Sequence, residues 1–371
     1  MYETITHAPA DLSDPRLFIN RELSLLEFDR RVLDQARDAD TPLLERLRFL
    51  GISSTNLDEF FEIRASGLRQ QVAFGVSQPG PDGLTPQEAL AQISESAHRL
   101  VEEQYRLLNE GLLPELATQG IRVLGPEQWT LRQARWLRRY FSGEVVPVLT
   151  PMGLDPAHPF PRVLNKSLNY IVKVEGADAF GRGSGIAVVQ VPRSLPRLQA
   201  LPPEVRGGRH DFVLLSSIIE AHVGEIFPGM TVTGCWAFRL TRNSDLWVDE
   251  EEVDNLLQAL KGELPSRHFG DAVRLEVADN TPDDVAQDLL QHVKLTPAEL
   301  YRCRGPVNLH RLTALHEMVD RPDLHFPPFT PGLPRRLTNG TDLFSVLRRG
   351  DVLLHHPYES FGPVVELVRQ A

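Results

Sequence analysis

The segment RLRFLGISSTNLDEFFEIRASGLRQQV, residues 46–72, determines how we expect the front of the chain to fold. Apolar residues recur at helical spacing up to Leu50 and resume at Leu57, with Gly51 and a polar run at 53–56 between them. A glycine followed by polar residues is typical of a helix end, so the pattern predicts that two helices meet here.

Asn56 stands at the start of the second predicted helix, with Glu59 three positions later. This is the spacing of a capping box, in which the first side chain accepts hydrogen bonds from free helix amides and the second reaches back. Asn56 can therefore be a helix cap and nothing more. Its amide can also face a cleft and hydrogen-bond the base or ribose of a nucleotide. The residues alone leave both interpretations open.

The rest of the front part, residues 16–110, has apolar stripes at helical spacing, which predict a helical domain with a packed core. One helix start is well marked, after the connector PGPDGLTP at 79–86. There Thr85 is the expected cap, and Glu88 completes a capping box.

From about residue 120 the chain consists of short apolar runs separated by proline and glycine, which are typical of strands. Helices are expected between them at 132–141, 216–226 and 253–260. An α+β or α/β domain follows from this alternation. The glycine-rich GRGSG at 181–185 joins two strand-like runs without a following helix start, so a hairpin loop is favoured over a phosphate cradle.

Three candidate sites in this region each have a structural alternative. Asp155 and His158 can form an acid/base pair or belong to a rigid proline-rich loop. The acidic run at 249–252 can hold magnesium or simply occupy the first turn of a helix. Arg239 and Arg242, three positions apart, can hold a phosphate or mark an exposed strand end.

A third region follows the proline-dense segment 321–337, which predicts an extended linker and a domain boundary. Beyond it we expect a helix at 342–349, a strand at 352–356 and an amphipathic helix at 361–371. A strand followed by such a helix is half of a βαβ unit, which leads us to expect that the chain is cut inside a third domain.

His355 and His356 are adjacent in the predicted strand. Neighbouring strand residues point to opposite faces, so at most one of the two can face a given site. We therefore favour strand-end histidines over a catalytic or metal-binding pair.

Composition excludes several classes of protein. At 371 residues, with 42% hydrophobic and 24% charged residues, the chain is long enough for two or three globular domains. A net charge of −11 argues against a nucleic-acid-binding protein. Neither a spanning helix nor a signal peptide is found in the pattern. Cys235 and Cys303 lack metal-ligand spacing and are expected to be reduced thiols of a cytoplasmic protein.

Long ordered stretches of the chain closely resemble bacterial polyphosphate kinases of the first class. The matching stretches are FINRELSLLEFDRRVLDQA (18–36), PLLERLRFLGISSTNLDEFFEIRASGL (42–68), TPMGLDPAHPFPRVLNKSLNYIV (150–172), WAFRLTRNSDLWVDEEE (236–252), YRCRGPVNLHRL (301–312) and DVLLHHPYESFGPVVELVRQA (351–371). The resemblance covers nearly all of this chain but not the whole family protein.

This resemblance implies a multidomain α and α+β fold. The family has a helical N-terminal domain, a head domain used in dimerisation and two phospholipase D-like catalytic domains. The corresponding parts here are residues 1–115, the mixed α/β head at 116–325, and a linker with the truncated start of an α/β phospholipase D-like domain at 326–371. We expect homo-oligomers formed through the head domain.

The resemblance also implies a function, the reversible transfer of the terminal phosphate of ATP to inorganic polyphosphate through a phosphohistidine. In the family the asparagine of the NLDEF motif contacts the nucleotide, and the matching residue is Asn56. The phosphorylated histidine and the ligands of Mg²⁺ lie beyond the HHPYESF match, so we assign no catalytic or metal-binding residue in this chain. Leu25 stands where the family often has an aromatic residue, which puts core packing there in question.

We therefore expect an enzyme fragment that binds ATP or ADP and is inactive alone. The alternative is a noncatalytic nucleotide-binding module that dimerises through residues 120–320. An arginine cluster near the end of the chain is a hypothetical entrance for polyphosphate, formed by Arg335, Arg336, Arg348 and Arg349.

Overall fold

The computed structural model describes residues 13–154, 160–176, 185–243, 270–337 and 342–371. The chain divides into two compact units, Met1–Leu324 and His325–Ala371, which we describe one at a time. Within the described ranges, no helix combines the length and the apolar character needed to cross a membrane.

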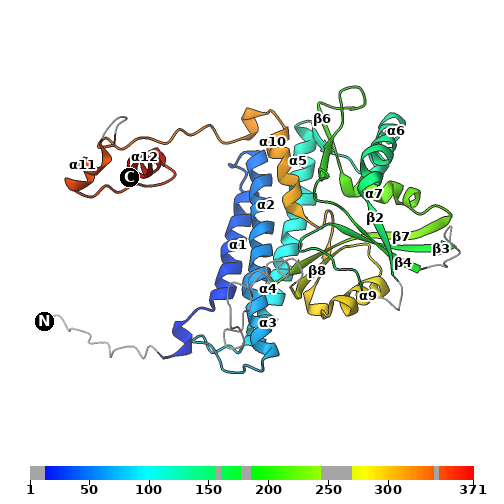
Figure 1. The fold of residues 1–371 in the computed structure, drawn as a ribbon, viewed down its shortest axis with the longest axis horizontal. Helices are drawn as coiled ribbons and strands as arrows, with labels where there is room; N and C mark the ends of the chain where they lie inside the picture. Colours follow the sequence, from blue (N-terminus) through cyan, green and yellow to red (C-terminus); the bar gives the residue numbers. More distant parts are fainter. Residues whose placement is uncertain (1–12, 155–159, 177–184, 244–269, 338–341) are drawn as a thin grey trace. The chain divides into compact units, whose positions relative to one another are not determined.

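Three long helices of the first unit stand side by side: α1 (Arg21–Arg37), α2 (Leu43–Glu59) and α4 (Pro86–Arg106) (Figure 1). The π-helical turns η2 (Phe60–Ala65) and η3 (Leu107–Leu112) continue α2 into α3 (Ser66–Ala73) and α4 into α5 (Leu113–Thr118). The predicted capping box is confirmed, because the Thr85 hydroxyl accepts from the Glu88 amide and the Glu88 carboxylate accepts from the Thr85 amide.

The predicted helix break before Asn56 is wrong, because α2 runs unbroken through Gly51 and Asn56. Gly51 is needed for packing instead. A Cβ atom built on Gly51 would lie 2.1 Å from Cγ2 of Thr313, in the 3₁₀ turn η10 (Leu309–Thr313). The polar run also fits inside the helix, since buried Ser53 accepts a 2.8 Å hydrogen bond from the Gln104 side chain.

The larger of the two sheets in this unit has six strands, in the order β2-β4-β3-β7-β8-β9. Its strands are β2 (Thr150–Leu154), β3 (Asn169–Gly176), β4 (Gly185–Gln190), β7 (Met230–Arg242), β8 (Ala272–Ala278) and β9 (Leu300–Cys303). Neighbours are antiparallel except β8 and β9, which are parallel. The antiparallel β3–β4 pair agrees with the expected hairpin, although its loop at 177–184 lies outside the described residues.

A second sheet has three short strands, with β6 (His210–Leu214) between β1 (Ile121–Val123) and β5 (Leu198–Ala200). Two predicted helices are confirmed as α6 (Leu131–Tyr140) and α7 (Leu215–His222), whereas the one predicted at 253–260 lies outside the described residues. The described residues of this unit also form the helices α9 (Asp283–Val293) and the short α10 (Ala314–Met318).

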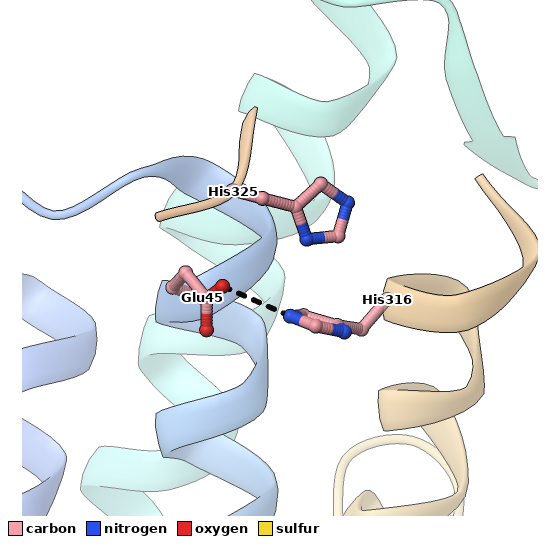
Figure 2. Close-up of side chains that lie close together, drawn as sticks. All are labelled: Glu45, His316 and His325. Atoms are coloured by element: carbon pink, nitrogen blue, oxygen red, sulfur yellow. Dashed lines mark hydrogen bonds and ion pairs between the residues drawn. The ribbon is translucent and has the colours of Figure 1, made fainter. Parts of the chain in front are cut away.

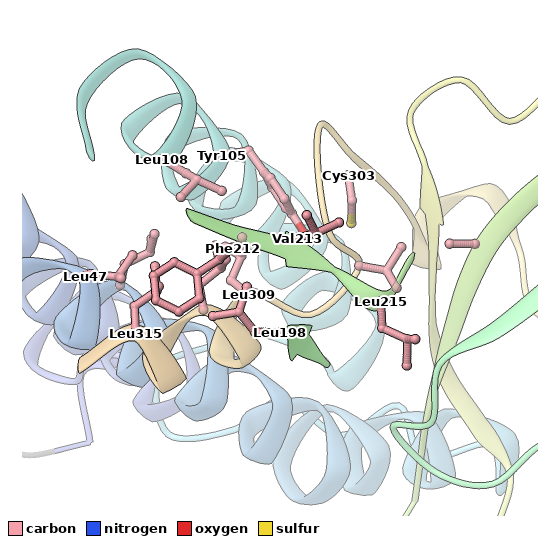
Figure 3. Close-up of a cluster of buried hydrophobic side chains, with 14 of the residues drawn as sticks. Leu47, Tyr105, Leu108, Leu198, Phe212, Val213, Leu215, Cys303, Leu309 and Leu315 are labelled. Carbon is pink, nitrogen blue, oxygen red and sulfur yellow. The ribbon is translucent and has the colours of Figure 1, made fainter. Parts of the chain in front are cut away.

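One hydrophobic core joins the helices to the small sheet. Figure 3 shows Leu47 of α2 and Leu108 beside Phe212 of β6 and Leu198 of β5. A second core fills the space between α9 and the large sheet, where Leu289 meets Phe238 and Leu275. Because the main core spans both regions, α2 has a fixed position relative to the strands.

The second unit, His325–Ala371, contains α11 (Leu343–Arg348) and α12 (Gly362–Gln370), as predicted. The predicted strand at 352–356 is wrong, because those described residues form no strand. The backbone instead closes a turn in which the Glu359 amide donates to the His355 carbonyl oxygen at 2.8 Å. The His355 amide donates to the Glu359 carboxylate, also at 2.8 Å, so its hydrogen-bonding groups are not available for a sheet.

Candidate functional site

Asn56 lies in the last turn of α2 and is half-buried. It lines a cavity of about 300 Å³ between α1 and the α2–η2 region. Helix α1 contributes Leu25, Phe28 and Asp29 to the wall. Leu25 is 40% exposed, so the residue that departs from the family pattern belongs to this cavity and not to the core.

Asp29 is the most unusual group in this cavity. It is only 3% exposed, and neither of its carboxylate oxygens makes a hydrogen bond of good geometry within the described residues. Burial raises its pKa to about 7, although the nearby side chains of Asn56 and Ser53 partly oppose that shift. A buried carboxyl with unused oxygens is costly unless a ligand or water completes it.

Together, the Asn56 amide and the Asp29 carboxyl can both donate and accept hydrogen bonds, because Asp29 is partly protonated near neutral pH. Leu25, Phe28 and Ile63 add an apolar wall. Such a cavity suits a flat ring with polar edges. Asp29 was not predicted from the sequence, because the predicted helix break placed Asn56 at a helix end. The signal available in the sequence was the position of Asp29, three residues after Leu26 and four before Leu33, on the apolar stripe of its helix.

The opposite side of α2 carries a buried ion network. Arg239 of β7 forms a bidentate pair with Asp58, with Nη1–Oδ2 and Nη2–Oδ1 distances of 2.7 and 2.9 Å. Arg274 of β8 donates to Asp58 Oδ1 at 2.8 Å, and Arg239 also donates to Glu276 at 2.8 Å. Burial alone would raise the pKa of Asp58, but the charges of the two arginines outweigh it and hold the pKa below its ordinary value.

Two cations and two anions balance in this network, which joins α2 to the large sheet. The Arg274 guanidinium also lies 5.0 Å from the centre of the Phe61 ring and 5.5 Å from that of Tyr301. These contacts indicate a structural role. In the sequence, the alternating charges of Arg274 and Glu276 inside an apolar strand were the signal for it.

The interpretation of Arg239 and Arg242 as an exposed strand end is wrong, since Arg239 is 1% exposed. Nor do the two arginines converge on one phosphate position. Arg239 is held by the acids of the network, whereas Arg242 donates to the carbonyl oxygens of Val163 and Gly270.

A further hydrogen bond fixes the other end of α2. Figure 2 shows the imidazole of His316, on α10, pointing at the carboxylate of Glu45, with 3.0 Å between Nε2 and Oε1. Glu45 is buried in the first turn of α2, so this contact pins α10 to that turn.

The remaining candidates are not gathered into a site. Asp155, His158 and the acidic run at 249–252 lie outside the described residues. His355 and His356 are exposed in the second unit. Of the arginine cluster there, Arg336 donates to the carbonyl oxygens of Gly350 and Asp351, while Arg335, Arg348 and Arg349 are exposed. Cys235 and Cys303 are free thiols, and burial raises the pKa of each.

Comparison with known proteins gives two family matches. Residues 18–124 match the polyphosphate kinase N-terminal domain, and residues 132–315 match the polyphosphate kinase middle domain. The polyphosphate kinase of Pseudomonas aeruginosa is 55% identical over 360 residues, which are 97% of this chain and 52% of that protein. The polyphosphate kinase of Neisseria meningitidis serogroup C is 55% identical over 351 residues, or 95% of this chain and 51% of that protein.

Among solved structures, the polyphosphate kinase from Porphyromonas gingivalis superposes with a TM-score of 0.74 at 27% identity. The match covers 95% of this chain and 49% of that one. The chain therefore spans about half the length of the relatives it matches. With both domain models and these relatives in agreement, the chain belongs to the polyphosphate kinase family.

Proposed function

We propose that this chain supplies the nucleotide-contacting and head regions of a polyphosphate kinase, an enzyme that reversibly transfers the terminal phosphate of ATP to inorganic polyphosphate through a phosphohistidine. Family membership supports the reaction. The observation that carries the nucleotide contact is the cavity in which Asn56 lies beside the incompletely hydrogen-bonded carboxyl of Asp29.

In this proposal the adenine or ribose end of ATP occupies the Asn56 cavity. Asparagine matches the hydrogen-bonding edge of adenine, which presents a donor and an acceptor side by side. The Asp29 carboxyl adds a further donor or acceptor, and the apolar wall covers the ring. The lining carries an acid, Glu59, and a cation, Arg64. In this proposal the acid disfavours phosphate groups inside, and the arginine faces a triphosphate that points out of the cavity.

The same residues do not fit Mg²⁺, which prefers ionised carboxylates among its oxygen ligands. The pKa of Asp29, about 7, keeps much of this carboxyl protonated at neutral pH. We therefore derive no step through the metal in this cavity.

Phosphoryl transfer needs an in-line nucleophile and cations that offset the developing charge. We propose that both belong to the part of the relatives that this chain does not match, and that residues 326–371 begin a phospholipase D-like domain. The division into regions 1–115 and 116–325, oligomerisation through the second of them and a cytoplasmic location are parts of the same proposal.

The experiment is to incubate the 371-residue chain with radiolabelled ATP and Mg²⁺, and to measure polyphosphate formation and protein-bound phosphate. We expect ATP to bind, with neither polyphosphate nor phosphohistidine formed. Phosphorylation of a histidine in this chain, or synthesis of polyphosphate by it, would contradict the proposed division of labour.

A further inference from the structure

A second cavity, of about 260 Å³, lies in the sheet region of the first unit. Five cationic side chains line it: Lys166, Arg193, Arg197, Arg239 and Arg311. They come from four separate places, namely the approach to β3, the segment between β4 and β5, strand β7, and the 3₁₀ turn η10. The first residues of α7 also face it, through Ser216 and Ser217. We call it the arginine cavity.

Three of the four arginines of this cavity lack counter-charges. Within the described part of the chain, Arg193, Arg197 and Arg311 form no ion pair. The other two cations are paired, Arg239 with Asp58 and Glu276, and Lys166 with Glu62 at 2.6 Å. Arg193 and Arg197 each donate to a backbone carbonyl oxygen, those of Asn165 and Val191. Nη1 of Arg197 is buried and has no hydrogen-bond partner among the described residues.

The buried, unpartnered Nη1 of Arg197 costs free energy in the absence of an anion. Burial, followed by the charges of Arg311 and Arg193, lowers the pKa of Arg197 to about 10. Burial and the charges of Arg239 and Arg193 likewise lower the pKa of Arg311. Two acids line the wall, Glu220 of α7 and the exposed Asp279. Glu220 gives little compensation, because burial raises its pKa to about 7.

The start of α7 adds to the positive field. Its N-cap is Leu214, which provides no side-chain acceptor for the first free amides. Free amides at a helix N-terminus favour anions, although alone they do not define a site. The Leu215 amide donates to the Arg197 carbonyl oxygen, and the next residues of α7, Ser216 and Ser217, line the same cavity as the unpaired guanidinium groups.

We infer that the arginine cavity binds an anion made of two or more linked phosphoryl groups. Guanidinium groups bind phosphate oxygens in bidentate fashion, which suits several adjacent phosphates better than one. The volume equals that of roughly nine water molecules at ~30 Å³ each, enough for a short condensed phosphate and small for a whole nucleotide. None of the lining residues belongs to the Asn56 cavity, so the inference does not depend on the proposed nucleotide contact.

The test uses the 371-residue chain and isothermal titration with tripolyphosphate, orthophosphate and ATP in separate runs. We expect tripolyphosphate to bind more tightly than orthophosphate, with an affinity that falls as salt rises. The Arg193→Ala/Arg311→Ala double variant should lose at least about tenfold in tripolyphosphate affinity. The side chains of Arg193 and Arg311 are exposed and lie outside the core, so the double variant is expected to fold. If its melting temperature is nevertheless lowered, the single variant Arg311→Gln is used for the same titration.

Two controls separate this site from other effects. Arg99→Ala removes an exposed arginine of α4 and should leave the tripolyphosphate affinity unchanged. Asn56→Ala should also leave it unchanged, whatever it does to ATP. An unaltered affinity in the arginine variants, an equal loss in Arg99→Ala, or no preference for tripolyphosphate over orthophosphate would overturn the inference.

Discussion

Two faces of helix α2 differ in the partners that the protein provides for the buried acids beside them. Asp58 and Asn56 are two positions apart on α2, which places them about 200° apart around the helix axis. On the Asp58 face, Arg239 and Arg274 neutralise the buried acid from the sheet. On the Asn56 face, buried Asp29 has two carboxylate oxygens without a good hydrogen bond among the described residues.

This difference in partners distinguishes a charged side chain with a structural role from a polar side chain that is available to bind a ligand. The Asp58 network obtains its balancing charges from the protein, so loss of one partner would leave an uncompensated buried charge, which is the mark of a structural ion pair. The Asn56 cavity lacks such partners and has space of about 300 Å³ in front of it. Burial alone would not have separated the two, because Asp29 and Asp58 are 3% and 5% exposed.

The largest effect on stability is expected from removing Asp58 from the buried ion network. Asp58→Ala leaves two buried arginines with only Glu276 between them, and should lower the free energy of unfolding by about 3–5 kcal/mol. Urea unfolding measures this loss. The matched control is Asp284→Ala, which removes the exposed pair with Lys173 and should leave the free energy of unfolding nearly unchanged. Equal losses in the two variants would show that the network is not the structural anchor.

The contribution of Asp29 to the free energy of unfolding should depend on pH in the opposite sense to that of a salt-bridged acid. The folded pKa of Asp29, about 7, lies above its ordinary value of 3.8, so the folded state holds this proton more tightly than the unfolded one. Its contribution to stability therefore falls as pH rises through this interval and is lowest above pH 7. Asp29→Asn should stabilise the chain by a few kcal/mol at pH 8 and by less at pH 5.

Thermal or urea unfolding at the two pH values measures this difference. Asp34→Asn, an exposed change on the same helix, is the control and should show no such pH dependence. If Asp29→Asn were equally destabilising at both pH values, the Asp29 carboxyl would have its hydrogen-bond partners within the folded protein. The two sides of α2 would then not differ in the way described.

A smaller effect tests whether α2 must be one continuous helix. Gly51→Ala places a methyl group against Thr313 and should cost about 1–3 kcal/mol. Gly67→Ala, where no atom lies within 4 Å, should instead stabilise the helix by about 0.5–1 kcal/mol. Adding Thr313→Ser removes the clashing methyl and should rescue Gly51→Ala. A stabilising Gly51→Ala would mean that α2 does not pack against η10 as described.

Local signals predicted those parts of the fold in which neighbouring residues decide the structure. The capping box at Thr85 and the helices α6, α7, α11 and α12 are of this kind. Gly51 misled the prediction because its role is set by Thr313, which is distant in the chain. The predicted strand at 352–356 failed because a strand needs a partner, and its backbone is engaged in a local turn.

The candidate site was predictable only in part. Asn56 was singled out through its resemblance to a family motif, while Asp29 required the packing of α1 on α2. The partners of Asp58 come from strands more than 180 residues later, which no local pattern connects to it. The three unpaired arginines likewise come together only through the sheet topology.

The most direct test is the affinity of the 371-residue chain for ATP, measured by titration for the unchanged chain, Asn56→Ala and Thr55→Ala. Thr55 precedes Asn56 on α2, does not line the cavity, and donates only to the Gly51 carbonyl oxygen. Loss of the paired amide contacts should weaken ATP binding by about tenfold in Asn56→Ala, with little change in Thr55→Ala. Undiminished affinity in a folded Asn56→Ala chain would contradict the nucleotide site.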